Sequence, residues 1–259
     1  MPIDFHRDIN RRSYSDRDAD DSWLSVVGAL VEPTGARVLD IGCGGGIYTR
    51  AWHELGAAGV TGVDFSEPIL DSARRSDGDL PGVRFILGDA AATGLPAGSA
   101  DIVFERALVH HVADLAAVIG EARRLLRPGG VYLVQDRTPG DVAVPGSPTH
   151  PRGWLFEVFP KLLLVEESRR PGAEGLARLL AAQHFTNVTI HQLWETRRRY
   201  ADREDYLAEI GRRTGRSILH KLSDAELAHL MEELRARLLG GPLEERDRWT
   251  LWRAELSTA

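Results

Sequence analysis

The stretch Val38-Leu39-Asp40-Ile41-Gly42-Cys43-Gly44-Gly45-Gly46 constrains the fold most, because an apolar run ends at a carboxylate and then breaks into glycine. The apolar residues of this run suit a buried strand of a parallel sheet that is covered on both faces. The glycines allow backbone angles, and a close approach of a ligand, that a Cβ would forbid. Residues 47–55 then predict a helix that Gly56 ends. This order of strand, glycine turn and helix is typical of a nucleotide-binding cradle.

A second carboxylate supports this interpretation. Residues 59–64 predict the next strand, and Asp64 at its end lies twenty-two positions after Gly42. In a dinucleotide-binding fold, an acidic residue at about this place meets the ribose hydroxyls, so NAD stays open as a ligand. The dinucleotide fingerprint, however, has a third glycine where this chain has Ile47. No lysine follows the turn as it does in a P-loop.

At this point the sequence resembles the class I S-adenosylmethionine (SAM)-dependent methyltransferases, in particular the small-molecule methyltransferases similar to those of ubiquinone biosynthesis. The resemblance covers about residues 36 to 138 and depends on five stretches in the family's order and spacing. These stretches are residues 38–46, 63–66, 85–90, 101–104 and 125–130. Motifs of this kind are specific for the fold and the cofactor but do not identify the acceptor.

The resemblance implies SAM as the cofactor and S-adenosylhomocysteine as the product. It implies that the Asp64 carboxylate binds the ribose hydroxyls, and that Asp89 and the Ala90 N–H bind the adenine. In the family, a basic and aromatic group near the amino terminus often folds over the cofactor, although a solvated arm is an equal alternative here. The candidate cofactor residues are Tyr14, Arg17, Asp40, Gly42, Cys43, Gly44, Asp64, Phe65, Asp89, Ala90 and Arg106.

Cys43 is the only cysteine in the chain. A disulfide and a cysteine metal cage are therefore excluded. A small residue that fits a tight turn explains Cys43 better than a nucleophile, which would need an electropositive partner.

The acceptor is expected near the end of the fourth predicted strand, residues 100–104, because ligands gather at the carboxyl ends of strands in open α/β sheets. A helix is predicted to carry residues 108–112. His110 and His111 are the candidate catalytic residues, because a neutral imidazole can accept a proton from an acceptor O–H or N–H. Neighbours on a helix point about 100° apart, so one of the two can be a structural residue.

Two other chemistries are disfavoured at this segment. Family members that methylate amino groups of nucleic acids carry an Asn/Asp/Ser-Pro-Pro-aromatic motif here, whereas this chain has Glu105-Arg106-Ala107-Leu108. Catechol-type members hold magnesium with carboxylates, and Glu105 and Asp136 could be placed in that way. Arg137, however, stands where an Asn ligand would be expected, so no metal site is predicted.

The charge distribution also disfavours nucleic acid as a partner. Residues 1–140 contain fourteen Lys and Arg against twenty Asp and Glu, while residues 141–259 contain eighteen of each. An acidic cofactor domain repels a phosphate backbone. No apolar run is long enough to span a bilayer and no leader pattern precedes the fold, so we predict a cytoplasmic protein.

The predicted fold is α/β, with a Rossmann-like, seven-stranded, mostly parallel sheet, helices on both faces and a helical cap formed by inserts. We expect an amino-terminal arm and helix (1–35), a SAM-binding core (36–140) and a cap insert (141–172). A core helix with the sixth strand (173–199), a helical cap insert (200–246) and the last strand (247–259) would follow.

The inserts are the expected source of specificity. Residues 154–159 are aromatic and apolar, which suits a lid or a partner surface. Ser223 and Glu226 form a capping-box pattern before a helix that should run to Leu239. The last two strands are expected at residues 188–194 and 248–256. The run 197–199 of three arginines fits a solvated strand edge better than a site for an acidic substrate.

The predicted function is the transfer of the SAM methyl group to an O, N or C atom of a small-molecule acceptor. Proximity and orientation can supply most of the rate, because a sulfonium leaves without being protonated. The sequence leaves a homodimer open. The alternatives are an NAD-dependent oxidoreductase and a non-catalytic, SAM-binding regulatory or partner protein.

Overall fold

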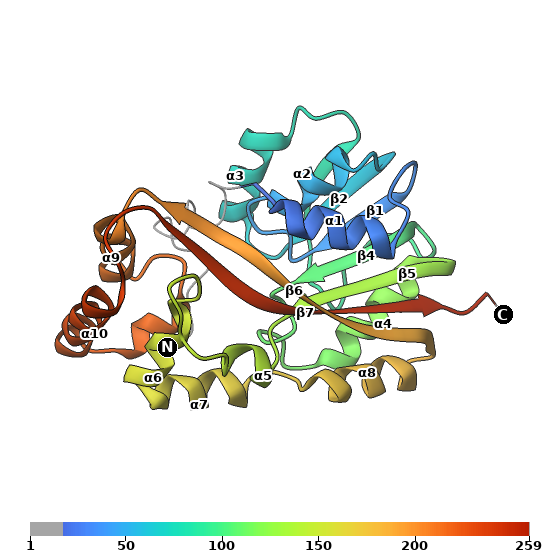
Figure 1. The fold of residues 1–259 in the computed structure, drawn as a ribbon. Helices are drawn as coiled ribbons and strands as arrows, with labels where there is room; N and C mark the ends of the chain where they lie inside the picture. Colours follow the sequence, from blue (N-terminus) through green and yellow to red (C-terminus); the bar gives the residue numbers. More distant parts are fainter. Residues whose placement is uncertain (1–17, 259) are drawn as a thin grey trace. The chain divides into compact units, whose positions relative to one another are not determined.

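The computed structural model describes residues 18–258, which contain a seven-stranded sheet of order β3-β2-β1-β4-β5-β7-β6 (Figure 1). The strands are β1 (Arg37–Ile41), β2 (Gly59–Asp64), β3 (Val83–Leu87), β4 (Ala100–Arg106), β5 (Leu126–Asp136), β6 (Phe185–Tyr200) and β7 (Leu243–Leu256). Pairing is parallel from β3 through β5, whereas β7 runs antiparallel to β5. The predicted Rossmann-like sheet is confirmed.

Five helices of the described chain belong to the sheet-containing unit 2: α1 (Asp21–Leu30), α2 (Ile47–Glu54), α3 (Glu67–Asp77), α4 (Leu115–Leu125) and α8 (Ala173–Ala182). Helix α1 precedes β1, α2, α3 and α4 follow β1, β2 and β4, and α8 precedes β6. The remaining helices are α5 (Pro139–Val142), α6 (Arg152–Val158), α7 (Pro160–Ser168), α9 (Arg203–Gly211), the short η2 (Ser217–Lys221) and α10 (Asp224–Arg237). None of the helices in residues 18–258 has the length and apolar character that a membrane span requires.

Two consecutive residues of β4 show that helices cover both faces of the sheet, since neighbours along a strand point to opposite sides. The Phe104 ring lies 5.6 Å from the rings of Trp23 in α1 and Trp52 in α2. Val103 belongs instead to an apolar cluster that includes buried residues of α4 and α8. The sheet is therefore buried between two helical layers, as its continuous apolar strands require.

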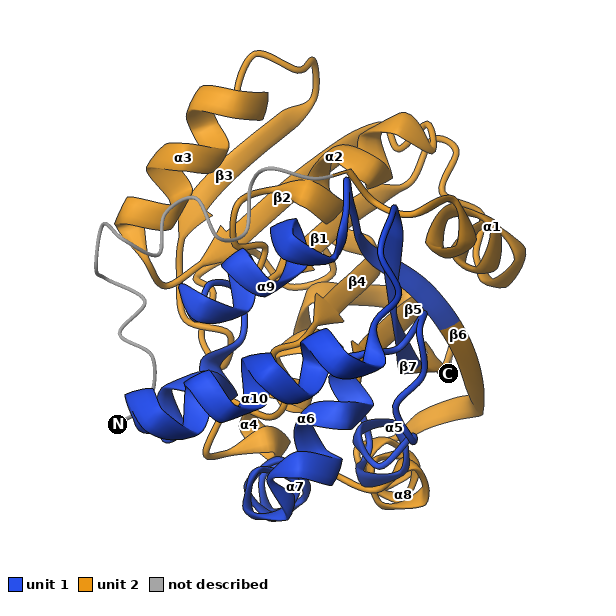
Figure 2. Ribbon diagram, turned by 60° about the vertical axis from the view of Figure 1, so that its left-hand side comes forward, with its two compact units in different colours: residues 1–4, 137–170, 194–249 blue, residues 5–136, 171–193, 250–259 orange. Residues whose placement is uncertain are grey.

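The chain divides into two compact units (Figure 2). Among the described residues, unit 2 comprises 18–136, 171–193 and 250–258, and unit 1 comprises 137–170 and 194–249. Unit 1 has an apolar core of its own, formed by residues of α6, α7, α9, η2 and α10. The predicted capping box at the start of α10 is confirmed, because the Ser223 hydroxyl accepts from the Glu226 N–H and the Glu226 carboxylate accepts from the Ser223 N–H.

The apolar stretch 154–159 forms core rather than an exposed lid face. Trp154, Leu155 and Phe156 are 9%, 0% and 5% exposed within unit 1. Glycine makes this packing possible, because a Cβ on Gly146 would lie only 2.0 Å from the Trp154 ring. The sequence pattern could not distinguish the two outcomes, since a lid face and a small core are equally apolar.

Three elements differ in extent from the sequence prediction. Residues 108–112 form a turn instead of a helix, because Ala107 takes a φ of 53° and α4 begins only after its cap, Asp114. Strands β6 and β7 extend well beyond the predicted segments 188–194 and 248–256. The extra residues 195–200 and 243–247 are mostly charged and lie in unit 1, and along β7 they alternate between buried and partly buried positions.

Candidate functional site

The turn after β1 is held in place by the end of β2. The N–H groups of Gly42 and Cys43 both donate to the Val63 carbonyl, at 2.7 and 3.0 Å. Gly42 and Gly44 have φ values of 74° and 54°, which glycine adopts without strain. A Cβ built on Gly44 meets no atom of residues 18–258 within 4 Å, so none of these residues packs against this side of the peptide.

Asp64 at the end of β2 connects this turn to the start of α3. Its Oδ2 accepts from the Gly44 N–H at 2.9 Å, and its Oδ1 accepts from the Ser66 N–H at 3.0 Å. The side chain is nearly buried, and these two backbone donors fix the plane of its carboxylate. Asp64 is therefore oriented before any ligand binds.

The buried side chain of Asp40 links β1 to α2. Its Oδ2 accepts from the Thr49 hydroxyl at 2.6 Å, and the residue is 2% exposed. Burial raises the pKa of the Asp40 carboxyl to about 7, the Thr49 hydrogen bond opposes this rise, and the charge of Asp64 adds to it. Asp40 thus acts chiefly as a structural tie beneath the glycine turn.

Cys43 lies between these two carboxyl groups. Burial raises the pKa of the Cys43 thiol well above its usual value, and the charges of Asp40 and Asp64 raise it further. A thiol in this environment stays protonated and is a poor nucleophile. The small side chain also fits tightly, because a Cβ on Gly62 would lie 2.9 Å from its sulfur.

Large apolar side chains are exposed where β2 and β3 end. Phe65 is 49% exposed and Leu87 is 56% exposed. Asp64 and Leu87 are paired across the two strands, so Phe65 and Leu87 lie at the same edge of the sheet. Asp89 follows in an exposed turn, in which its Oδ1 accepts from the Ala91 N–H at 2.7 Å. This edge offers apolar contact surface next to a carboxylate, which suits a planar, polar ring.

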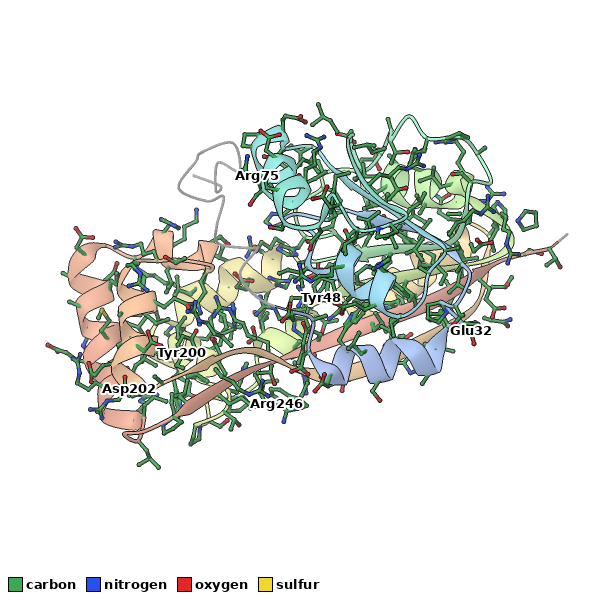
Figure 3. The ribbon with its side chains drawn as sticks, turned by 90° about the horizontal axis from the view of Figure 1, so that it is seen from above. Glu32, Tyr48, Arg75, Tyr200, Asp202 and Arg246 are labelled. Atoms are coloured by element: carbon green, nitrogen blue, oxygen red, sulfur yellow. The ribbon has the colours of Figure 1, made fainter. Side chains whose placement is uncertain are left out.

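The residues after β4 pack against the glycine turn. A Cβ on Gly42 would lie 3.2 Å from the Leu108 side chain, so this turn of the chain covers the Gly42 peptide. Tyr48 of α2 is labelled in Figure 3. The Arg106 guanidinium lies over the Tyr48 ring, 4.5 Å from its centroid, and lowers the pKa of Asp40. Ala107 then takes its left-handed conformation and donates its N–H to the Gln135 carbonyl at 2.9 Å.

His110 is paired with a carboxylate that the sequence had suggested only as a metal ligand. Its Nδ1 lies 2.7 Å from Oδ2 and 3.0 Å from Oδ1 of Asp136, the last residue of β5. The His110 ring also contacts the exposed His111 ring, with centroids 4.0 Å apart. The expected divergence of the two histidines on a helix is therefore wrong, because the segment is a turn. The buried Asp136 carboxylate gives His110 a partner that fixes its ring.

Glu105 is a buried acid that sequence reasoning did not identify as unusual. It is 1% exposed, and neither of its carboxyl oxygens has a hydrogen-bond partner of normal geometry within residues 18–258. Burial raises the pKa of Glu105 to about 8, and the nearby Tyr132 hydroxyl offsets only part of this rise. Within the described part of the chain, no group of three or more His, Cys, Asp and Glu side chains could hold a metal ion.

The sequence of the central segment matches a known family. Residues 39–134 match the family described as "Methyltransferase domain" (Methyltransf_11). The chain is 38% identical over 128 residues to the ubiquinone biosynthesis O-methyltransferase of Xanthomonas axonopodis pv. citri, covering 47% of this chain and 52% of that protein. It is 36% identical over 108 residues to the malonyl-[acyl-carrier protein] O-methyltransferase of Serratia marcescens, covering 42% and 41%. The chain thus spans about half or less of these relatives.

Solved structures agree on the fold. Phosphoethanolamine N-methyltransferase 2 of Haemonchus contortus, solved with SAM, superposes with a TM-score of 0.63 at 21% identity, covering 98% of this chain and 60% of that one. A SAM-dependent methyltransferase from Mesorhizobium loti superposes with a TM-score of 0.53 at 23% identity, covering 90% and 97%. The chain contains a class I SAM-dependent methyltransferase domain. The nicotinamide alternative is not favoured.

The geometry of this methyltransferase domain fits SAM. Within the described chain no atom lies near a Cβ built on Gly44, a preoriented carboxylate lies at the end of β2, and two apolar side chains are exposed at the adjoining strand ends. These features would otherwise be hard to explain, since large exposed apolar side chains cost solvation free energy. The predicted contacts of Tyr14 and Arg17 lie outside the described residues.

Proposed function

We propose that the chain transfers the SAM methyl group to a small-molecule acceptor that carries a proton on the attacked O or N atom. The observation that carries this proposal is the His110–Asp136 pair in the turn that covers the glycine turn of the methyltransferase domain. A carbon nucleophile remains the second candidate within the same reaction class. The proteins similar to this domain are named for different acceptors, so the proposed acceptor class rests on the His110–Asp136 pair.

The proposed cofactor contacts follow from the strand ends. The Asp64 carboxylate, which the Gly44 and Ser66 N–H groups orient, would accept from the ribose hydroxyls. Asp89 and the Ala90 N–H would bind the adenine edge while Phe65 covers a ring face. When bound, SAM supplies a methyl group on a sulfonium that needs no protonation to leave.

Gly42, Cys43 and Gly44 would line the methionine end of the cofactor through their backbone. Arg106 would act at the same end, where its guanidinium also supports Tyr48 and moderates the charge of Asp40. Asp40 would stabilise the glycine turn through the hydrogen bond that it accepts from the Thr49 hydroxyl. None of these groups touches the methyl group in the proposal, so their effect is on cofactor affinity.

The His110–Asp136 pair would act on the acceptor. The Asp136 carboxylate would accept a hydrogen bond from the Nδ1–H group of His110. In this tautomer Nε2 carries the lone pair, and it would take the proton from an acceptor O–H or N–H. The same carboxylate stabilises the imidazolium that forms when the proton arrives. His111, which is exposed, would shape the wall beside His110.

Two measurements test this function. Calorimetry should detect SAM and S-adenosylhomocysteine binding, whereas NADH should give no heat. A panel of phenols, amines, thiols and carbon acids with radiolabelled SAM should then give transfer to an O–H or N–H acceptor. Failure of the chain to bind either SAM or its product would refute the proposal. Transfer to carbon alone would refute the assigned base role but not the cofactor.

Nucleic acid is not the proposed acceptor, because the cofactor domain is acidic and the segment 105–108 lacks the base-methylation motif. Radiolabel transferred from SAM to a nucleic-acid fraction would contradict this expectation. The homodimer and the cytoplasmic location stay predictions, and sedimentation of the full chain tests the first.

A further inference from the structure

A cavity of about 320 Å³ lies where strands β1, β2 and β3 of unit 2 begin (Figure 1). We call it the strand-start cavity, and its lining consists of residues 37–39, 59–61, 82–84 and Ser99. Its volume falls within the range of about 300–1,000 Å³ that is typical of small-molecule sites. All of the lining residues belong to one compact unit, so the cavity can be described without reference to unit 1.

Glycine creates the space of the strand-start cavity. Gly59 is in register with Arg37 of the neighbouring strand, so a side chain at Gly59 would lie beside that of Arg37. A Cβ built on Gly59 would meet the Gly82 carbonyl oxygen at 3.7 Å, which is an ordinary van der Waals contact. Gly82 itself is fixed by the Val60 N–H, which donates to the same carbonyl at 2.9 Å. The floor of the cavity is therefore backbone, and a side chain could occupy the space above it.

Two arginines bring unused N–H groups to the cavity. Arg84 Nε donates to the Thr61 hydroxyl oxygen at 2.7 Å, while its two Nη groups make no hydrogen bond or ion pair with residues 18–258. Arg37 Nε donates to the Asp101 carboxylate at 3.1 Å, and its Nη groups are likewise without partners in the described chain. Each guanidinium therefore keeps a pair of Nη donors available for a ligand.

Two hydroxyl groups of the lining also lack acceptors. Thr61 is 5% exposed, and although its oxygen accepts from Arg84, its own proton reaches no acceptor among the described residues. The Ser99 Oγ is buried and has no hydrogen-bond partner within residues 18–258. Buried polar atoms without partners are rare and call for a ligand or water. Because all of these groups can donate, a ligand that only accepts hydrogen bonds complements them best.

Asp101 is the carboxylate nearest to these donors in the described hydrogen bonds, and it is already engaged. It accepts from the Arg37 N–H at 2.7 Å, from Arg37 Nε and from Arg127 Nε. Burial acts to raise the pKa of Asp101, but the hydrogen bonds from Arg127 and Arg37 outweigh this effect and lower the pKa to about 2. Asp101 therefore holds the Nε side of Arg37 as a charged group and leaves the Nη side to the cavity.

We propose that the strand-start cavity binds a small molecule through a phosphate or carboxylate group. The planar guanidinium of Arg84 presents its Nη donors as a fork that matches two oxygens of such a group. Arg37 would contribute a second fork, and the hydroxyls of Ser99 and Thr61 would donate to the remaining lone pairs of the oxyanion. Leu39 and the glycine backbone would contact the rest of the ligand. The inference does not depend on the proposed methyl transfer.

The strand-start cavity is separate from the proposed cofactor site. The cofactor residues follow the carboxyl ends of β1, β2 and β3, whereas the cavity lies where the same strands begin. The two ends of β1, Arg37 and Ile41, are roughly 13 Å apart at about 3.3 Å per residue. A ligand of the cavity should therefore bind while S-adenosylhomocysteine occupies the cofactor site.

Titration calorimetry of the full chain with inorganic phosphate and with succinate, each with and without saturating S-adenosylhomocysteine, tests the site. We expect one of these anions to bind in both conditions, and the tighter one shows whether a phosphoryl or a carboxyl group is recognised. Arg84→Gln should weaken this binding by about tenfold or more, because the charged fork is lost. Arg84→Lys keeps the charge and should weaken it by less. Arg75→Gln on α3, an exposed arginine labelled in Figure 3, is the matched control and should leave anion affinity unchanged.

Gly59→Val tests the cavity without removing any charge. Its Cβ meets no atom closer than 3.7 Å, and valine favours a strand, so the melting temperature should be equal to or above that of the wild type. The added side chain should fill the floor and abolish anion binding. Unchanged anion affinity in Gly59→Val or Arg84→Gln, no binding of either anion, or loss of binding in the presence of S-adenosylhomocysteine would overturn the inference. SAM binding, measured on the same variants, reports separately on the proposed function.

Discussion

The Nδ1 atom of His110 and the carboxylate of Asp136 lie 2.7 Å apart, and their side chains are only 6% and 0% exposed. Asp136 is the last residue of β5 and is held opposite Thr250 of β7. Its position is therefore fixed by the sheet, while His110 comes from an irregular turn. A rigid strand end thus orients an imidazole that the turn alone could not position.

Replacing Asp136 by Asn should lower kcat by about two to four orders of magnitude, because the amide no longer selects the Nδ1–H tautomer or stabilises the imidazolium. SAM affinity should stay near that of the wild type. The matched control is His111→Gln, which changes the exposed neighbour and should have a much smaller effect on kcat. Equal losses from both variants would show that the pair is not the base.

Asp64→Asn should weaken SAM binding by about one to two orders of magnitude, because charge-assisted hydrogen bonds to the ribose are lost. The amide must also turn its NH₂ group toward Gly44 N–H or Ser66 N–H, so the melting temperature should fall as well. Asp71→Asn on α3, with a side chain 43% exposed, is the control. Calorimetry of both variants decides, and an unchanged Kd for Asp64→Asn would remove this residue from the cofactor site.

Gly44→Ala separates backbone strain from ligand clash. A Cβ at this position meets no atom of residues 18–258 within 4 Å, so the stability loss should be only the cost of a left-handed alanine, on the order of 1–2 kcal/mol. Gly98→Ala is a close control, with a φ of 64° and likewise no described atom within 4 Å of a Cβ. Urea unfolding should rank the two variants alike, whereas only Gly44→Ala should weaken SAM binding. Similar SAM affinities in both would show that no ligand approaches Gly44.

The fold of the cofactor domain could be predicted from the sequence because its signals are local and agree with one another. Each strand from β1 to β4 ends near a carboxylate or glycine, and helices α2, α3 and α4 follow β1, β2 and β4. The end of β4 was the exception. The pattern around Leu108 fits an apolar helix face, but the left-handed Ala107 and the Asp114 cap delay the helix. Such backbone conformations are set by tertiary contacts rather than by propensity.

The charged partners within unit 1 could not be predicted, since they join residues far apart in the sequence. The three arginines 197–199 were expected at a solvated edge, which holds for Arg199 but not for Arg197, whose partners are Glu209 and Glu245. Nothing local distinguishes these arginines. His110 and Asp136 were each identified from the sequence as candidate residues. Their pairing could not be predicted, because it depends on the register of β4 against β5.

Trp154→Ala should destabilise unit 1 by about 3–5 kcal/mol, because the ring is buried against Gly146 and its removal leaves a cavity. The loss follows from its place in the core, not from a role as a mobile lid. Leu164→Ala is the control, since this side chain is 67% exposed and should change stability little. Thermal unfolding compares the two. A Trp154→Ala chain as stable as the control would contradict the burial of Trp154 and would support the exposed face that the sequence suggested.

Glu105 makes stability depend on pH in a direction opposite to that of a paired carboxylate. Its folded pKa of about 8 exceeds the ordinary value of 4.5, so the folded chain holds this proton more tightly than the unfolded chain. Its contribution to the free energy of unfolding is therefore fully present below about pH 4.5 and is lost as pH rises toward 8. Asp40, with a pKa of about 7, acts in the same direction.

Glu105→Gln should remove much of this dependence, because the amide is neutral at every pH in the window. We expect urea unfolding at pH 5.5 and pH 8 to show a smaller decrease for the variant than for the wild type, by an amount on the order of a few kcal/mol. Glu67→Gln is the control, since that side chain is 51% exposed and should leave the slope unchanged. Equal slopes for Glu105→Gln and Glu67→Gln would mean that the Glu105 carboxylate does not titrate in this range.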